Sequence, residues 1–408
     1  MTTTTLGYTL FVALAVLGIA FAAPAAGQRL ERGQTVLDRP RPLYQPHGVR
    51  VRAFVLQSAV EQRVAYVDNL QARADGGDSD LVARTAPELA LRSDWPRHGA
   101  SLRARAVQTW HRMHEEENTL AGSLDAAGRF DLGAADRLRL KAGWARQFEP
   151  RSSPDDPGTR SPSAFDLRRV SLEHRMRLGA VTATTHGGLR WIDYHDAELP
   201  DGTVVDNDDR DHVRMTAQNR LALPVQPRTD AFVQGTFDVR RYDAKVDDRG
   251  FARDSMGYEV VAGSAFDLTG LTFGEVYAGW RRQVYGDSEL GDVEGLAAGL
   301  TLTSSVTELT TLRLGLSRQI KETTIAGASG VVATETALRV DHELLRNLLL
   351  HGQATYGLAK FEGLGRRDGT LGLRLGASYL MNRWLHWQVD LRHTRRHSEV
   401  ASAEYART

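Results

Sequence analysis

The sequence predicts an all-β protein, a transmembrane antiparallel up-and-down β-barrel of about 18 strands. Three observations predict this class. Long segments alternate apolar and polar residues, and the connections between them alternate between short and long. After Gln28, no apolar stretch approaches the roughly 20 residues that a membrane-spanning helix needs. A membrane protein of this composition must therefore be a closed barrel, because lipid satisfies no backbone polar group.

Alternation is clearest between Asp166 and Leu178, where Val170, Leu172 and Met176 fall on one face. Successive side chains of a strand point to opposite faces, so Arg169, Arg175 and Arg177 fall on the other face. About seventeen segments show this pattern, most of them longer than the roughly 5–6 residues usual for globular strands. The segments are 51–68, 80–94, 98–113, 117–131, 135–148, 165–178, 180–194, 210–223, 230–242, 256–268, 271–285, 293–304, 308–321, 333–343, 346–361, 368–380 and 383–396.

The connections form two sets. We expect short periplasmic turns around Trp95, Gly133, Gly179, Thr269, Arg346 and Met381. We expect longer polar outer loops at 71–80, 149–163, 196–209, 243–255 and 321–330. A β-sandwich of this size would lack such a rhythm, and no stretch sustains the 3.6-residue apolar stripe of a helix.

The two ends of the chain carry separate expectations. Residues 1–27 are expected to be a signal peptide, since an apolar run from Leu10 to Ala23 precedes small residues that suit a signal peptidase. Residues 28–49 are Pro-rich and polar, and we expect a periplasmic leader without fixed structure. The barrel is expected over residues 50–408. Residues 401–408 resemble a loop and the start of one more strand, so we expect either an eighteenth strand that is cut short or a miscount of one strand.

Strand parity assigns a set of basic residues to the polar face, which in a barrel lines the interior. The expected pore-lining residues are Arg103, Arg105, Arg139, Lys141, Arg169, Arg175, Arg177, Arg214, Arg220, Arg240, Arg281, Arg313, Arg374 and Arg392. Parity adds Arg190, and fewer acids share these faces: Glu173, Asp238, Glu259, Asp267, Glu275 and Asp390. Fixed positive charge in a water-filled path favours anions. The alternative is that these arginines pair with interior acids, loops or lipopolysaccharide and serve stability alone.

Other chemistry finds little support. The acidic stretch Asp206–Asp211 lacks the Gly and distant Glu of an EF-hand loop, so we expect a solvated outer loop. His111 and His114 are three residues apart and would point to opposite faces of a strand, which argues against zinc. Ser288 lies in a block resembling the GDSL motif of lipases, but in a predicted loop without a positioned base. With no cysteine, no P-loop and no exposed basic patch, we expect no enzyme activity, no cofactor, no metal and no nucleic-acid partner.

Several short blocks resemble the bacterial outer-membrane proteins called the second putative beta-barrel porin family. They are Gly48–Asn69, Leu89–His98, Asn207–Arg210, Gly257–Gly270, Gly327–Gly330 and Val340–Leu350. The resemblance lies in their order along the chain, from about residue 33 to the end. It implies an outer-membrane barrel of a Gram-negative bacterium, often associated with export of surface polysaccharide.

Two functions follow as expectations. The first is an outer-membrane pore that passes anionic solute, or assists polysaccharide export, through an Arg-lined lumen. The second is a non-conducting structural or receptor-type barrel. The expected partners are outer-membrane lipid and lipopolysaccharide, the barrel assembly machinery and polysaccharide export components.

Overall fold

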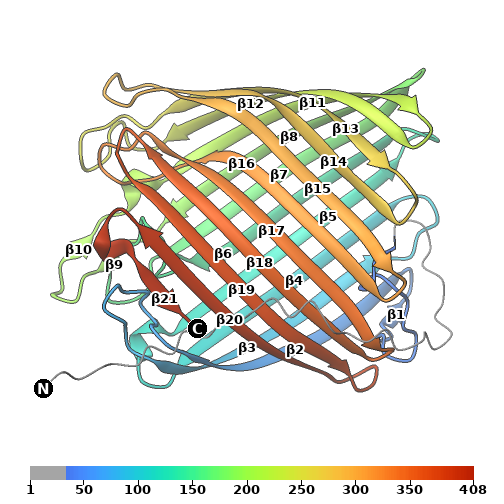
Figure 1. Ribbon diagram of the computed structural model, residues 1–408, viewed down its shortest axis with the longest axis horizontal. Coiled ribbons are helices and arrows are strands. Elements are labelled where there is room, and N and C mark those ends of the chain that lie inside the picture. Colours follow the sequence, from blue (N-terminus) through green and yellow to red (C-terminus); the bar gives the residue numbers. More distant parts are fainter. Residues whose placement is uncertain (1–33) are drawn as a thin grey trace, which may run out of the picture.

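The computed structural model describes residues 34–408, so the expected signal peptide and the first residues of the leader lie outside the described part. The strands form one 19-stranded antiparallel sheet curved into a barrel (Figure 1). Each of the seventeen predicted segments corresponds to one long strand, with ends within a few residues of the expected ones. The long strands are β2 (Phe54–Val67), β3 (Asp80–Ser93), β4 (Gly99–His111), β5 (Thr119–Asp131), β6 (Arg137–Phe148), β7 (Ala164–Leu178), β8 (Val181–Tyr194), β11 (His212–Gln226), β12 (Thr229–Tyr242), β13 (Ser255–Asp267), β14 (Thr272–Tyr285), β15 (Val293–Thr307), β16 (Thr310–Lys321), β17 (Gly330–Leu345), β18 (Leu348–Glu362), β19 (Arg367–Leu380) and β20 (His386–Ser398).

Seven short elements complete the fold. The strands are β1 (Val49–Val51), β21 (Tyr405–Arg407) and the hairpin β9 (Ala197–Glu198) and β10 (Val204–Val205). The 3-10 turns are η1 (Glu115–Glu117), η2 (Asp208–Arg210) and η3 (Ala401–Ala403). Of these elements, β21 is the short last strand expected within residues 401–408, and the sequence pattern had not identified the others as separate elements. No helix among the described residues is long and apolar enough to cross a membrane.

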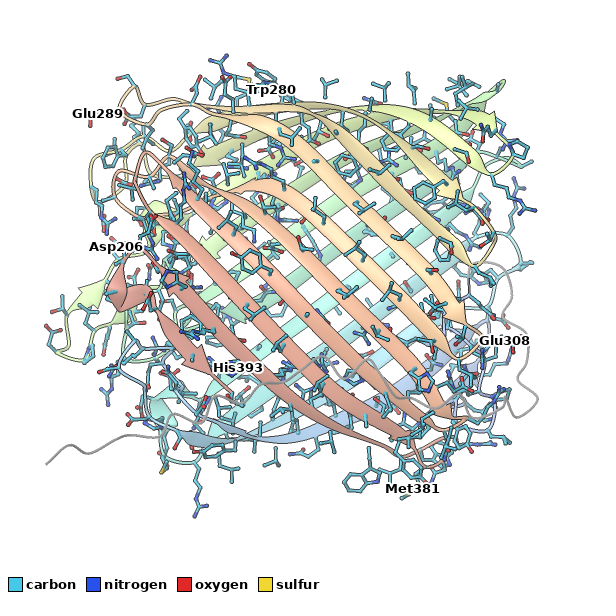
Figure 2. The ribbon with its side chains drawn as sticks, viewed as in Figure 1. Asp206, Trp280, Glu289, Glu308, Met381 and His393 are labelled. Carbon is cyan, nitrogen blue, oxygen red and sulfur yellow. The ribbon has the colours of Figure 1, made fainter. Side chains whose placement is uncertain are left out.

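The short and long connections lie at opposite ends of the barrel, as the sequence predicts. In Figure 1 the long loops gather at the left end, where the β9–β10 hairpin projects, and the short turns lie at the right. Figure 2 shows Asp206 and Glu289 at the loop end, and Glu308 and Met381 at the turn end. We call these the loop end and the turn end.

The two faces of the sheet differ as strand alternation requires. The outer face carries exposed apolar side chains, among them Trp280 at 51% exposure and Leu391 at 61%. Figure 2 shows Trp280 on the outside of the barrel. Apolar surface on this scale is unfavourable in water and stable in lipid, where strands meet their backbone hydrogen bonds within the barrel. The opposite face, here called the inner face, carries most of the charged side chains of the strands.

The barrel has a seam between the long strands β20 and β2, and a short strand lies in this seam at each end of the barrel. At the loop end β21 pairs with β20, and the N–H of Asp68 donates to the carbonyl of Thr408 at 3.2 Å. At the turn end β1 pairs with β2. In the described part of the chain, β2 pairs with β1 and β3, and β20 pairs with β19 and β21, so no ladder joins β2 directly to β20.

The expectation of an unstructured leader is wrong for residues 34–48, here called the N-terminal strap. Thr35, Val36, Arg39 and Arg41 are all buried, with Val36 fully so. The strap makes turns and lies against the turn end of the barrel. A Pro-rich polar segment orders here because its arginines meet acceptors on distant strands, which composition does not reveal.

Candidate pore and its constrictions

The strand register places all fourteen predicted basic residues on the inner face. Arg139, for example, lies opposite Glu173 of β7, and Arg214 of β11 lies opposite Arg190 of β8. Antiparallel partners share a face, so one assignment propagates around the whole sheet. The register therefore shows that these residues share the face opposite the apolar one, and the side-chain contacts show which of them are neutralised.

Ten of the fourteen have a carboxylate within 4 Å. Arg220 binds Glu275 through both terminal nitrogens at 2.8 and 2.9 Å, and Arg374 binds Asp390 at 2.8 Å. The paired residues are Arg103, Arg105, Arg139, Arg169, Arg214, Arg220, Arg240, Arg281, Arg313 and Arg374. For these ten residues the geometry favours a structural role, because each guanidinium lies against a carboxylate of the wall, although some carboxylates, such as Asp341, serve two arginines.

Several inner-face cations have no carboxylate partner among the described residues. Four come from the predicted set, Lys141, Arg175, Arg177 and Arg392, and Arg190 is a further one; Arg84, Arg92 and Arg396 share the same face and also lack a carboxylate. Arg190 stands in a row of arginines on adjacent strands, with Arg169 and Arg214 directly opposite it. The row continues to Arg240 on β12. Asp125 binds Arg169 and Asp238 binds Arg214, which leaves Arg190 as the uncompensated charge of the row.

Two inner-face glycines allow ion pairs to form across a strand. A Cβ at Gly143 would lie 2.7 Å from the Asp125 carboxylate and 2.9 Å from Nε of Arg169, so any side chain there would separate the pair. Gly376 has the same role between His351 and Asp390, whose side chains bond at 2.8 Å. These contacts tie alternate strands together and keep the paired cations close to the wall.

The β6–β7 loop, residues 149–163, crosses the interior near the loop end. The Asp155 carboxylate accepts hydrogen bonds from the hydroxyl of Thr323 at 2.7 Å and from the N–H of Thr324 at 2.8 Å. Arg396 of β20 donates to the carbonyl of Ser152 at 2.8 Å. Because β6 and β7 are separated from β16 and β20 by many strands around the barrel, this loop spans the lumen. We call it the crossing loop.

The base of the crossing loop is held by buried ion pairs. Arg151 binds Glu117 at 2.8 Å, and Arg210 binds Glu149 at 3.0 Å, with all four side chains less than a tenth exposed. Its partner loop at 322–329 is fixed in turn by Arg253, which donates to the carbonyl of Thr323 at 2.7 Å and binds Asp247 at 2.6 Å. The loops therefore form one interlocked layer.

The crossing loop does not fill the interior. A cavity of about 570 Å³ lies between its tip and the inner face of β17–β19. Short side chains line the wall of this cavity, among them Ala337, Thr355 and Thr370. Room for a solute therefore remains beside the loop tip.

The N-terminal strap narrows the turn end. Glu343 of β17 binds Arg41 at 2.6 Å and Arg39 at 3.2 Å, and all three side chains are at most 5% exposed. The N–H of Val36 donates to the hydroxyl of Thr311 at 3.0 Å, and Nε2 of His386 contacts the carbonyl of Tyr44 at 3.0 Å. The strap thus follows the wall from β16 to β20, opposite the wall of β7 that carries Arg175 and Arg177.

The residues considered for other chemistry lie at the loop end, where His111 is the last residue of β4 and most of the others lie in the connections. His114 precedes η1 and bonds to the buried Asp80 at 3.1 Å. Ser288 lies in the β14–β15 loop, where the carboxylate of Asp287 accepts the N–H of Glu289. The exposed carboxylates of Asp196, Asp206 and Asp208 lie within 4.8 Å of one another. Among the described residues, this is the only group of three side chains close enough to hold a metal ion. The neighbouring charge of Asp206 raises the pKa of Asp208, as expected where acids repel one another in an exposed loop.

Asp211, at the end of this acidic loop, supports a pH prediction. Burial and the nearby carboxylates of Asp193, Asp208 and Asp243 raise the pKa of Asp211 to about 6, although it accepts the N–H of Tyr194 at 2.6 Å. The folded pKa lies above the unfolded value near 3.8, so ionisation of Asp211 costs the folded state stability above pH 6. This cost diminishes as the pH falls from about 6 towards 3.8.

We expect Asp211→Asn to slow hydrogen exchange in residues 195–211 at pH 8, because the amide oxygen still accepts the Tyr194 N–H without a charge. The gain should vanish near pH 4, close to the unfolded pKa. Asp201→Asn is the control, since a hydrogen bond from Thr203 lowers the pKa of Asp201 and neutralisation brings no gain. Equal protection gains at both pH values would contradict the assignment.

Comparisons with known proteins were made on the whole chain. A family model described as Putative beta-barrel porin 2 matches residues 41–408. No curated protein matches. Among solved structures, the outer membrane protein OpdK from Pseudomonas aeruginosa has a TM-score of 0.46 at 13% identity, covering 86% of this chain and 96% of that chain.

Two solved receptors and transporters are also similar. The ferric enterobactin receptor PfeA from Pseudomonas aeruginosa has a TM-score of 0.46 at 11% identity, covering 83% of this chain. The FrpB iron transporter from Neisseria meningitidis has a TM-score of 0.48 at 9% identity, covering 77% of this chain. This chain spans 62% of the first and 60% of the second. With TM-scores below 0.5 and identities of 9–13%, these similarities carry no argument about what crosses the membrane.

Proposed function

The chain belongs to the Putative beta-barrel porin 2 family, and from that premise we propose that it is a narrowed outer-membrane pore that anions enter in preference to cations. An outer-membrane pore or transporter barrel is the function that the family supports. The preference for anions is the further step. It rests on one observation: several inner-face cations lack a carboxylate partner, and one of them, Arg190, is flanked by two more arginines.

The energetic argument concerns charge that is not neutralised. A paired arginine presents little net field to a passing ion, whereas an unpaired one attracts an anion by about 1 kcal/mol at 4 Å in water, and by more where the path is narrow. The crossing loop occupies part of the lumen and leaves a cavity of about 570 Å³ between its tip and the wall. A solute that passes the loop must therefore travel close to the wall. A narrow path with unbalanced positive charge favours small anions, or an extended acidic polymer that threads through.

The alternative is a barrel that does not conduct. Two observations favour it: the crossing loop obstructs the loop end, and the N-terminal strap narrows the turn end. The two functions separate in a planar bilayer with a salt gradient. A stable conducting state whose reversal potential indicates anion preference supports the pore, and a folded barrel without conductance supports the alternative.

Replacing the unpaired cations tests the source of selectivity. We expect the combined variant Lys141→Gln, Arg175→Gln, Arg177→Gln and Arg190→Gln to reduce the anion-to-cation permeability ratio by about fivefold, the factor for about 1 kcal/mol of lost attraction. The reversal potential in a salt gradient measures this ratio.

The matched control removes a balanced pair. Arg220→Gln with Glu275→Gln deletes the two partners of a bidentate ion pair on the same face and leaves the net charge unchanged. We expect its permeability ratio to stay near that of the native chain. If the control and the combined variant shift the ratio equally, the unpaired cations are not the source of selectivity.

A further inference from the structure

A hollow in the outer face near the loop end is a candidate ligand site unrelated to the lumen. It lies on β18, β19 and β20 and has a volume of about 300 Å³. Figure 1 shows these three strands side by side at the front of the barrel. Its surface faces away from the pore, because Tyr356, Leu358 and Leu371 belong to the apolar set of the outer face.

The register explains the hollow. Gly369 lies at its centre, between Leu358 of β18 and His397 of β20. One row towards the turn end stand Tyr356, Leu371 and Arg395, and one row towards the loop end stands Arg367. A glycine surrounded by larger side chains leaves a depression, with leucine and tyrosine on one side and arginine and histidine on the other.

The two arginines of the hollow differ from most other outer-face arginines near the loop end. Asp254 neutralises Arg241 at 2.9 Å and Asp292 neutralises Arg282 at 2.7 Å. Arg146 and Arg168 are paired in the same way, with Asp166 and Asp193, whereas Arg318 of β16 also lacks a carboxylate among the described residues. In the described part of the chain Arg367 and Arg395 have no such partner, although both are exposed.

The nearby acids are already engaged. Glu399 accepts the backbone N–H of Arg367 at 2.8 Å, and Glu404 contacts Nδ1 of His397 at 2.6 Å. Neither contact neutralises the guanidinium of Arg367 or Arg395. Both guanidinium groups therefore remain available to an external anion at the edge of the apolar surface.

We propose that this hollow binds the phosphorylated sugar headgroup of an outer-leaflet glycolipid. Guanidinium groups bind phosphate through paired charge-assisted hydrogen bonds, which suits Arg367 and Arg395. The ring of Tyr356 offers a face for a sugar. The acyl chains lie along the leucines that continue towards the turn end, Leu371, Leu373 and Leu391, all of them exposed on the outer face. A soluble phosphate would make no use of this apolar surface.

The site places a glycolipid at the loop end alone, in keeping with an asymmetric membrane whose outer leaflet carries such lipids. It depends on the orientation of the barrel in the outer membrane and not on whether the barrel conducts. Loss of glycolipid binding and loss of conductance are therefore separate results.

Native mass spectrometry of the refolded full chain with bisphosphorylated lipid A tests the proposal. We expect a bound glycolipid on the native chain, and at least about tenfold weaker binding for Arg367→Gln with Arg395→Gln, because two charge-assisted contacts are lost. Gly369→Leu keeps both charges and fills the hollow, since even a Cβ at Gly369 would lie 3.2 Å from the Tyr356 hydroxyl. We expect this variant to weaken binding as well.

The control is Arg241→Gln with Arg282→Gln. It also removes two positive charges from the outer face near the loop end, but both residues lie outside the hollow. We expect it to bind lipid A like the native chain. Heat-modifiable migration on a gel verifies that every variant is folded before binding is compared. The proposal is overturned if both hollow variants bind like the native chain, if dephosphorylated lipid A binds equally well, or if inorganic phosphate in molar excess displaces the glycolipid.

Discussion

Replacing Glu343 by alanine is expected to undock the N-terminal strap and raise the conductance of the barrel. Glu343 is the shared partner of Arg39 and Arg41, and its removal leaves two buried guanidinium groups with no carboxylate. Breaking a buried ion pair costs about 3–5 kcal/mol, which is large beside the net contribution of about 1 kcal/mol from each remaining hydrogen bond between the strap and the barrel. The strap should then leave the turn end, and the open-channel conductance should increase.

A cysteine reporter separates undocking from conductance. The chain contains no cysteine, so Val36→Cys introduces a single thiol at a fully buried position of the strap. In the Glu343→Ala background we expect maleimide to label it roughly 100-fold faster, the factor that corresponds to about 3 kcal/mol of lost docking. Faster labelling without a change in conductance would mean that the strap lies outside the ion path.

Glu335→Ala is the matched control for Glu343→Ala. Glu335 lies on the same strand and the same face, but towards the loop end, and its ion pair with Lys321 is half exposed. An exposed pair contributes little, and the strap does not contact it. In the Glu335→Ala background, maleimide should therefore label Val36→Cys at the same rate as in the chain that carries Val36→Cys alone.

Replacing Asp155 by alanine is expected to free the tip of the crossing loop and enlarge the passage at the loop end. The Asp155 carboxylate accepts three hydrogen bonds from Thr323 and Thr324, at 2.7, 2.8 and 3.1 Å. Hydrogen bonds to a charged group are worth about 1.5–3 kcal/mol each, so together they hold the tip against its conformational entropy. We expect higher conductance and more current fluctuation, since a mobile loop samples open and obstructing positions.

Two further variants sharpen this experiment. Thr323→Val with Thr324→Val removes two of the three donors from the opposite wall and should shift conductance in the same direction by a smaller amount. Asp201→Ala removes an exposed carboxylate of the β9–β10 turn that bonds only locally, to Thr203, and should leave conductance unchanged. Unchanged conductance in the Asp155 variant would show that the cavity beside the loop, and not the loop tip, sets the size of the passage.

The two constrictions explain why the unpaired cations matter. Without the crossing loop and the strap, a wide lumen would screen charges on the wall within a Debye length of roughly 8 Å at physiological salt. With both in place, solute is directed along the wall, where Arg190 and Arg177 have no partner. Selectivity and constriction are therefore expected to decrease together in the Asp155 variant.

The sequence by itself determined the strands, the two faces and the two ends of the barrel. Alternation is a local property, because a strand between lipid and water must present apolar residues such as Leu371 and Leu373 outward and Arg374 inward. The polar loops and short turns follow from the same requirement. For this reason the predicted segments and the inner-face assignment of Arg214 or Arg220 agree with the register.

The tertiary structure alone decided which inner-face charges are neutral and where the lumen narrows. Arg220 meets Glu275 only because β11 and β14 lie near each other in a curved sheet, 55 residues apart in the chain. Arg41 meets Glu343 across 302 residues, and Thr323 meets Asp155 across 168. Such pairings depend on register, closure of the barrel and the path of loops through its interior, and no local pattern of residues encodes them.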